Sequence, residues 1–237
     1  MVPKLFASNV SPAVRSTLMT IKALGIDVEI IPVNMSIGEH LRPDYLKMNP
    51  MHTVPTLKDD ECVIYDSHAI NIYLIEKYQQ NTDLYPRDAA KRAIVHQRLF
   101  LEAGIIFPRN ADIVRSILKE GAKTVNKEKA AKVIEGYNFL ETILETSEYA
   151  AGDKMTIADF SLVATVTSAN VLVPIAANRY PKISEWITKM EQLPYYKEAN
   201  VSGKWASWWT RFPKIHSTKI YSSVFLKCLK SLHLSLT

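Results

Sequence analysis

Glycine and cysteine are scarce in this chain of 237 residues, which contains seven glycines and two cysteines. Neither G-x-G-x-x-G nor G-x-x-x-x-G-K-[ST] occurs, so the loops that usually bind dinucleotides and nucleoside triphosphates are missing. Cys62 and Cys228 are far apart and form no C-x-x-C motif. Their spacing excludes zinc ribbons, dithiol oxidoreductases and disulfide-rich scaffolds, and it predicts reduced thiols in a cytoplasmic protein that needs no metal.

We expect no signal peptide at the beginning of this sequence, and most of the chain lacks an excess of one charge. Residues 1–10 are too short and too polar for a signal peptide or a membrane span. The net charge of +5 comes from the C-terminal end, where residues 201–237 carry six basic side chains and no acidic ones. We expect a solvated extension there, with no nucleic acid partner and no membrane contact.

The first 80 residues predict alternating strands and helices. Strands are predicted at residues 4–7, 28–33, 53–58 and 62–65, with a helical or irregular stretch at 38–46. A helix should begin at Ser11-Pro12, because serine is a favoured N-cap and proline a favoured first helical residue. A second helix should begin at Ser67. Pro55 must lie at a strand edge, at a bulge or in a cis bond.

The rest of the chain predicts helices only. Residues 81–87 form a polar linker, and residues 88–203 form a helical domain with helices at 88–121, 126–144 and 182–193. Pro108 should kink the first of these helices. Thr156 and Asp159 have the spacing of a capping box. Residues 204–237 are the basic tail, which contains tryptophan.

Several polar residues in the first domain have both a structural and a functional interpretation. Ser11 is either a simple N-cap or a hydroxyl presented at a helix start. Val54, beside Pro55, either lies at a strand edge or offers its backbone to an extended peptide. Asp66 and Ser67 either cap a helix or bind a carboxylate at its N-terminus. His40 and His52 lie in polar loops, where an exposed histidine usually has no ligand.

Taken together, these motifs resemble those of the cytosolic glutathione transferases. The resemblance rests on Ser11 after a strand, on the segments NPMHTVPTL (49–57) and DSHAI (66–70), and on TIADF (156–160) in the helical half. SPAVR (11–15), GEHL (38–41) and LPYY (193–196) are similar to the insect epsilon class. The resemblance covers most of the chain before the tail. It implies a thioredoxin-like α/β N-terminal domain, an all-α C-terminal domain and a homodimer.

The resemblance also implies a role for each matching residue. Ser11 would donate its hydroxyl to the sulfur of glutathione, and His40 and His52 would lie near the glycyl carboxylate. Asp66 and Ser67 would hold the ammonium and the carboxylate of the γ-glutamyl end. The implied glutathione-binding set is His40, His52, Thr53, Val54, Pro55, Asp66 and Ser67.

A second, hydrophobic substrate would occupy the helical domain. The proposed lining residues are Phe107, Asn110, Ala111, Val114, Trp205 and Trp208. Alternatively, Phe107 and Val114 are ordinary core residues and Asn110 is solvated. The alternative for the two tryptophans is that they anchor the tail on the surface of the domain. The sequence departs from the family at two points: many epsilon enzymes have arginine where Ala111 stands, and a subgroup linked to ecdysteroid synthesis has an acid where Asn110 stands.

The preferred function is conjugation of glutathione to electrophiles such as insecticides or lipid-peroxidation products, and a peroxidase side activity is a further expectation. The alternatives are a non-catalytic carrier of hydrophobic ligands, a transferase of a steroid-hormone pathway, and an interaction module of the kind appended to translation factors. A glutaredoxin-like reductase is disfavoured because no cysteine lies near Ser11.

Overall fold

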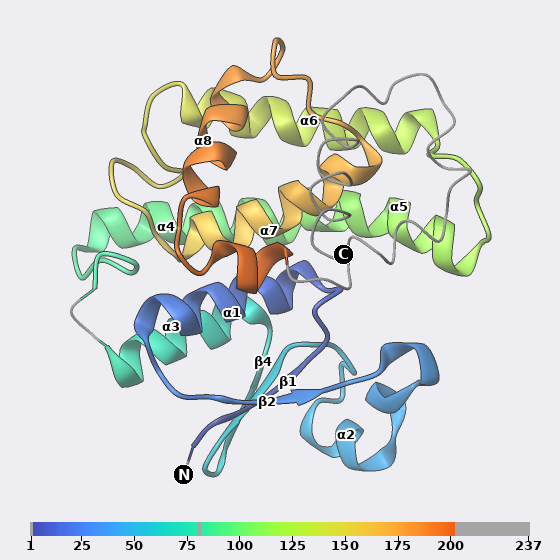
Figure 1. Ribbon diagram of the computed structural model, residues 1–237, viewed down its shortest axis with the longest axis vertical. Helices are drawn as coiled ribbons and strands as arrows, with labels where there is room; N and C mark the ends of the chain where they lie inside the picture. Colours follow the sequence, from blue (N-terminus) through green and yellow to red (C-terminus); the bar gives the residue numbers. More distant parts are fainter. Residues whose placement is uncertain (1, 80–81, 202–237) are drawn as a thin grey trace, which may run out of the picture.

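The computed structural model describes residues 2–79 and 82–201 of the chain. Four strands form one mixed sheet in the order β2-β1-β3-β4, where β1 and β2 are parallel and the other pairs are antiparallel. Helices α1 and α3 lie between this sheet and the helical domain (Figure 1). The predicted tail, with Trp205 and Trp208, lies outside the described residues.

The N-terminal elements follow the predicted order. They are β1 (Lys4–Ala7), α1 (Pro12–Leu24), β2 (Glu29–Pro32), the 3-10 turns η1 (Met35–Ile37) and η2 (Glu39–Leu41), α2 (Pro43–Met48), β3 (Thr56–Asp59), β4 (Cys62–Tyr65) and α3 (Ser67–Tyr78). The strand predicted over residues 53–58 begins only at Thr56, because the Val54-Pro55 peptide is cis and proline cannot donate to the ladder. Residues 53–55 therefore form a loop at the end of the sheet.

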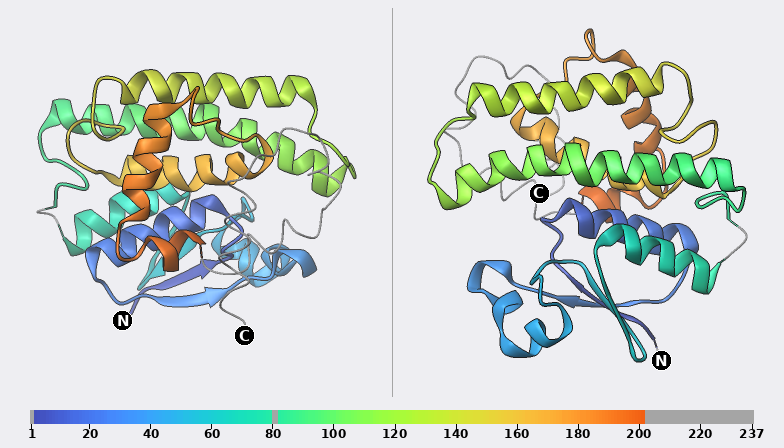
Figure 2. Two further views of the ribbon diagram at one scale, coloured as in Figure 1. Left: turned by 45° about the horizontal axis from the view of Figure 1, so that its top comes forward. Right: turned by 180° about the vertical axis from the view of Figure 1, so that it is seen from behind.

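The C-terminal part is helical, as predicted. It contains α4 (Ala89–Leu101), the π-helical segment η3 (Glu102–Ile106), α5 (Phe107–Lys119), α6 (Lys127–Leu144), α7 (Ile157–Leu172), α8 (Pro181–Glu191) and the π-helical turn η4 (Lys197–Val201). No helix among the described residues is long and apolar enough to cross a membrane. Figure 2 shows α4, α5 and α6 stacked on the side of α7 away from the sheet.

The single helix predicted over residues 88–121 is interrupted. The structure has α4, then η3, then α5, with Pro108 in the first turn of α5. Proline lacks the N–H that would bond to the preceding turn, so a wider π turn accommodates it there. The predicted kink is therefore a π-helical insertion before the proline, and it contains the buried Glu102.

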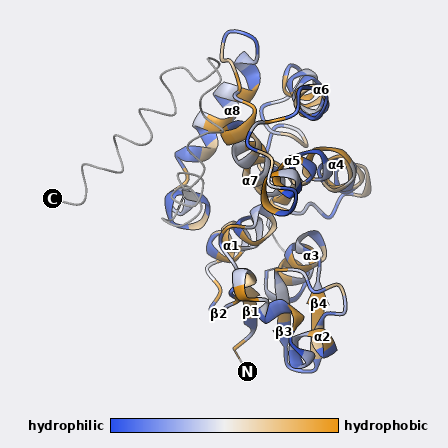
Figure 3. Cartoon of the chain, turned by 90° about the vertical axis from the view of Figure 1, so that its right-hand side faces the viewer, coloured by the Kyte–Doolittle hydropathy of each residue, from blue (hydrophilic) through white to orange (hydrophobic). Residues whose placement is uncertain are grey.

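The centre of the helical domain is α7, which packs against α1 of the first domain. Figure 3 shows α7 between α1 on one side and α6 and α8 on the other. The predicted capping box is confirmed, since the Thr156 side chain and Asp159 satisfy each other's backbone amides. Asp159 is fully buried and also accepts a hydrogen bond from Trp186. Burial raises the pKa of Asp159, and the donors around it partly offset that rise.

Arg15 joins the two domains from inside the core. It is almost fully buried on α1 and donates to the backbone oxygens of Ala164 and Asn200 at 3.1 Å, and to the hydroxyl of Ser168. Burial lowers the pKa of Arg15 to about 9. Because three acceptors from the helical domain surround one guanidinium, α1 cannot turn without breaking the contact between the domains.

Candidate active site

The hydroxyl of Ser11 faces the loop that contains Val54 and does not cap α1. Ser11 occupies the N-cap position of α1 by its backbone, but its side chain caps no amide. The hydroxyl instead lies 3.5 Å from the carbonyl oxygen of Val54, which is 43 positions away in the sequence. This distance is at the limit for a hydrogen bond, so the hydroxyl proton remains available to a stronger acceptor.

Buried polar side chains form hydrogen bonds that fix the loop containing Val54. The hydroxyl of Tyr45 donates to the Thr53 carbonyl at 2.6 Å, and the amide of Asn49 donates to the same oxygen at 3.0 Å. Both side chains also contact the hydroxyl of Thr56. These bonds fix the loop while, within the described part of the chain, the backbone of Val54 has no backbone partner. Val54 can thus pair with an extended peptide.

Asp66, and not Ser67, caps α3. The Asp66 carboxylate accepts from the amides of His68 at 2.8 Å and Ala69 at 3.3 Å. These two amides are therefore not free to bind a carboxylate of a ligand. The hydrogen bond from His68 lowers the pKa of Asp66, which keeps it ionised. Asp66 has a φ of 76°, and Ser67, beside it, is buried.

A buried charge cluster behind Asp66 was not predicted. His68 contacts Asp66 through Nδ1 at 3.3 Å and Glu102 through Nε2 at 3.0 Å, and Thr165 donates to Glu102. Burial lowers the pKa of His68, but the two carboxylates outweigh it and raise the pKa to about 9. The cluster links α3, η3 and α7. Its one signal in the sequence is an acidic residue in the apolar segment LFLEAGIIF (99–107).

His40 and His52 lie together at another edge of the site. Their ring centroids are 6.2 Å apart, and His52 has a φ of 47°. Burial, His52 and the positive charge of Lys119 lower the pKa of His40. A cationic imidazole at His40 is therefore disfavoured until an anion binds.

The four described residues that were predicted to line a hydrophobic site all lie on α5. Phe107, Ala111 and Val114 are each partly buried and follow helical spacing. Asn110 is only 4% exposed, so the alternative of a solvated Asn110 is wrong. Its Oδ1 atom has no hydrogen-bond partner within residues 2–79 and 82–201.

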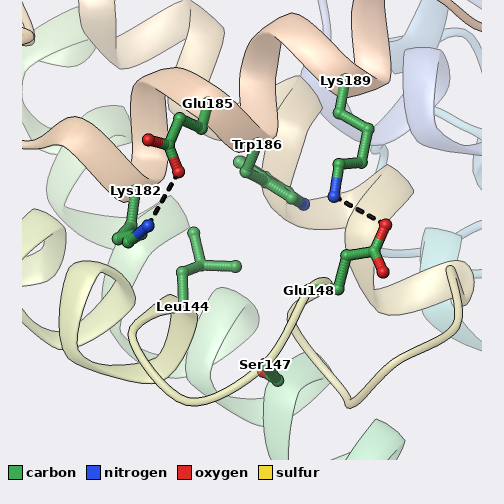
Figure 4. Close-up of a pocket in the computed structure, with 7 residues that line it drawn as sticks. All are labelled: Leu144, Ser147, Glu148, Lys182, Glu185, Trp186 and Lys189. Atoms are coloured by element: carbon green, nitrogen blue, oxygen red, sulfur yellow. Dashed lines mark hydrogen bonds and ion pairs between the residues drawn. The ribbon is translucent and has the colours of Figure 1, made fainter.

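A separate pocket lies on the outer side of the helical domain (Figure 4). It has a volume of about 120 Å³, with Leu144 and Trp186 among its lining residues and two ion pairs, Lys182–Glu185 and Lys189–Glu148, beside it. None of the predicted site residues lines it. Across the described ranges, no group of three or more potential ligand side chains that suits a metal ion is present.

A mixed four-stranded sheet with a cis-proline loop facing a helix-start serine, joined to an all-helical domain, defines a two-domain protein whose first domain is thioredoxin-like. Family models described as the N-terminal and C-terminal domains of glutathione S-transferase match residues 5–82 and 91–194. The chain belongs to the glutathione S-transferase family, whose enzymes use glutathione as co-substrate.

Individual relatives agree with this assignment. Glutathione S-transferase 1 of Manduca sexta is 44% identical over 86% of this chain and 94% of its own length. The structure of an epsilon-class transferase from the housefly Musca domestica is 42% identical, with a TM-score of 0.83 over 84% of this chain and 92% of that one. Glutathione transferase E6 of Drosophila melanogaster is 43% identical, with a TM-score of 0.85 over 89% and 97%. The resemblance to the epsilon class is thus confirmed.

Proposed function

We propose that Ser11 stabilises the thiolate of glutathione so that its sulfur attacks hydrophobic electrophiles. The observation that carries the proposal is the direction of the Ser11 hydroxyl, which caps nothing and faces the Val54 carbonyl at 3.5 Å. A cysteinyl residue paired with the backbone of Val54 would place its sulfur beside this hydroxyl. No general base is needed, because an ionised thiol is already nucleophilic.

The required change in pKa is within reach of the groups present. A free thiol with a pKa of about 8.5 is only about 3% ionised at pH 7. Lowering the pKa by about two units requires roughly 2.7 kcal/mol and makes the thiolate the main form. One hydrogen bond to a charged group contributes about 1.5–3 kcal/mol, and a helix N-terminus adds about 0.3–1 kcal/mol. Ser11 at the start of α1 supplies both.

The remaining contacts suit the charges of glutathione. Asp66 is held ionised and can accept the γ-glutamyl ammonium, with Ser67 beside it for the carboxylate. The backbone of Thr53, Val54 and Pro55 would face the glutathione peptide. A Drosophila mojavensis homologue, 38% identical to this chain with a TM-score of 0.83, has a structure with bound glutathione.

The electrophile would lie against Phe107, Ala111 and Val114, beside Asn110. The partly buried apolar face of α5 supports small hydrophobic substrates, as expected for detoxification in the cytoplasm. The unpartnered oxygen of Asn110 favours one alternative, a substrate that carries a hydroxyl such as a steroid. We also propose the domain boundaries that the sequence predicts: an N-terminal domain that ends at residue 80, and a helical domain that runs from residue 88 to residue 203.

A homodimer is proposed from the family resemblance and from several large apolar side chains that are individually exposed. Phe100 on α4 is 73% exposed and Met51 is 60% exposed, and Ile94 and Tyr65 are also exposed. Exposed side chains of this size are typical of protein interfaces. A second copy of the chain is the proposed partner. Light scattering should give twice the 26.8 kDa of one chain, and the monomer mass would refute the dimer.

The test of the function is the rate of glutathione conjugation to a chloronitroarene. In this reaction a carbon–sulfur bond forms, the carbon–chlorine bond breaks, and chloride and the thiol proton leave to solvent. Ser11→Ala should lower kcat/KM at least tenfold, whereas Ser36→Ala, on the exposed η1 turn, should match the wild type. Equal rates for both variants would refute the role of Ser11. No activity in any protein, together with tight binding of an apolar dye, would favour the ligand carrier.

A further inference from the structure

A backbone hydrogen bond in the first turn of α1 joins Ser11 to Arg15. The carbonyl oxygen of Ser11 accepts from the amide of Arg15 at 3.2 Å, whereas the Ser11 side chain caps no amide. The place of the Ser11 hydroxyl relative to Val54 therefore depends on how this turn of α1 is held against the rest of the molecule.

Arg15 ties this turn to two elements of the helical domain. The residue is 1% exposed, and its Nη1 atom donates to the carbonyl oxygen of Asn200 in η4 at 3.1 Å. Its Nη2 atom donates to the carbonyl oxygen of Ala164 at 3.1 Å and to the hydroxyl of Ser168, both on α7. A guanidinium is planar and rigid, so acceptors from two elements fix its position and its orientation together.

The η4 turn is itself held against α1. Figure 1 shows the orange-red end of the described chain beside α1, and the two elements pack against each other. Lys22 of α1 forms an ion pair with Glu198 at 2.7 Å, and the Asn200 side chain donates to the hydroxyl of Thr167 on α7 at 3.3 Å. Arg15 thus lies at the junction of α1, α7 and η4. A buried guanidinium that loses its acceptors is costly, so this junction resists a shift of α1.

We propose that Arg15 is a positioning residue for the Ser11 hydroxyl. This inference rests on the proposed function, because Ser11 is the residue through which Arg15 acts on the glutathione sulfur. Hydrogen bonds weaken steeply as their geometry departs from the optimum, so a displacement of about 1 Å removes much of the stabilisation of the thiolate. The guanidinium lies in the contact between the domains and takes no part in bond making.

The test compares Arg15→Lys and Ser168→Ala with a control, Tyr137→Phe. Arg15→Lys removes the planar fork. Ser168→Ala removes one acceptor and leaves the guanidinium in place, so it decides the question where Arg15→Lys does not fold. Tyr137→Phe also removes a buried hydrogen bond of the helical domain, from Tyr137 to the Val173 carbonyl at 3.0 Å. Tyr137 is on α6, which lies on the other side of α7 from α1 (Figure 3).

Two measurements separate positioning from a loss of stability: the thiol pKa of bound glutathione, from ultraviolet absorbance, and the pH profile of kcat. Arg15→Lys should raise the thiol pKa by about one unit, so that kcat at pH 6.5 falls about fivefold and approaches the wild-type value above about pH 8.5. Ser168→Ala should give a smaller change in the same direction, and Tyr137→Phe should give none. The double variant Ser11→Ala/Arg15→Lys should have the thiol pKa of Ser11→Ala alone, because Arg15 acts only through Ser11.

The inference is overturned if Arg15→Lys and Ser168→Ala both keep the wild-type thiol pKa while Ser11→Ala raises it. It is also overturned if Tyr137→Phe changes the thiol pKa as much as Arg15→Lys does, or if the double variant has a higher thiol pKa than Ser11→Ala. Failure of the proposed function has a different signature. In that case Ser11→Ala itself keeps the wild-type thiol pKa and conjugates glutathione at the wild-type rate.

Discussion

The cluster of His68, Glu102 and Asp66 makes stability depend on pH in a specific way. His68 is held between two carboxylates, and its side chain is only 14% exposed. The perturbation is the removal of one side of this bridge by His68→Gln or Glu102→Gln. Either change leaves the other buried group without its charged partner, which destabilises the contact between α3 and η3.

The magnitude follows from the pKa of His68, which is about 9 against an ordinary 6.5. Because the folded protein binds this proton more tightly, the contribution is fully present below about pH 6.5 and is lost as the pH rises through about 9. The shift corresponds to about 3 kcal/mol of unfolding free energy at pH 6 and roughly 2 kcal/mol at pH 7.5.

The assay is thermal unfolding between pH 6 and pH 10 for the wild type, each single variant and the double variant. Each single variant should lower the Tm by about 5 °C at pH 7.5, and His68→Gln should also lose the wild-type decline in Tm near pH 9. The control is Lys154→Gln, which breaks the Lys154–Asp83 ion pair, both of whose side chains are 70% exposed. It should cost less than about 1 kcal/mol. Parallel pH profiles for wild type and His68→Gln would refute the reasoning.

Three further substitutions test other contacts. Asp159→Ala removes the buried carboxylate that accepts from Trp186 and two amides, and denaturant unfolding should show a loss of about 3 kcal/mol. Tyr45→Phe removes the donor to the Thr53 carbonyl, so initial rates should show the KM for glutathione rising about threefold with little change in kcat. Asn110→Leu replaces an unpartnered buried oxygen at similar volume, so calorimetry should show the Tm rising by about 2–4 °C; a lower Tm would indicate that this oxygen has a partner.

Local signals in the sequence predicted the helix starts and most strands. Ser11-Pro12 marks the beginning of α1 because both residue types favour the first turn. The direction of the Ser11 hydroxyl was not predictable in the same way, since it depends on Val54, which is 43 positions away. The family resemblance implied that both residues belong to the glutathione site, and the contact between them appears only in the structure.

The residues that the sequence left unassigned depend on contacts between domains. Glu102 lies in a stretch that periodicity alone predicts as one continuous helix, and its role appears only when η3 brings it to His68. Lys119 is an ordinary exposed lysine in sequence terms. Its positive charge is one of the causes that lower the pKa of His40, after burial and His52. Apart from an acidic residue in an apolar segment, no short-range sequence signal marks the contact between Glu102 and His68.

The central claim is that Ser11 lowers the pKa of the thiol of bound glutathione. The most direct test is the ultraviolet absorbance of the bound thiolate as a function of pH, for wild type and Ser11→Ala at saturating glutathione. The account predicts a thiol pKa about two units below the free value of about 8.5 in the wild type, and a value near 8.5 in Ser11→Ala. The same low pKa in both proteins would contradict it.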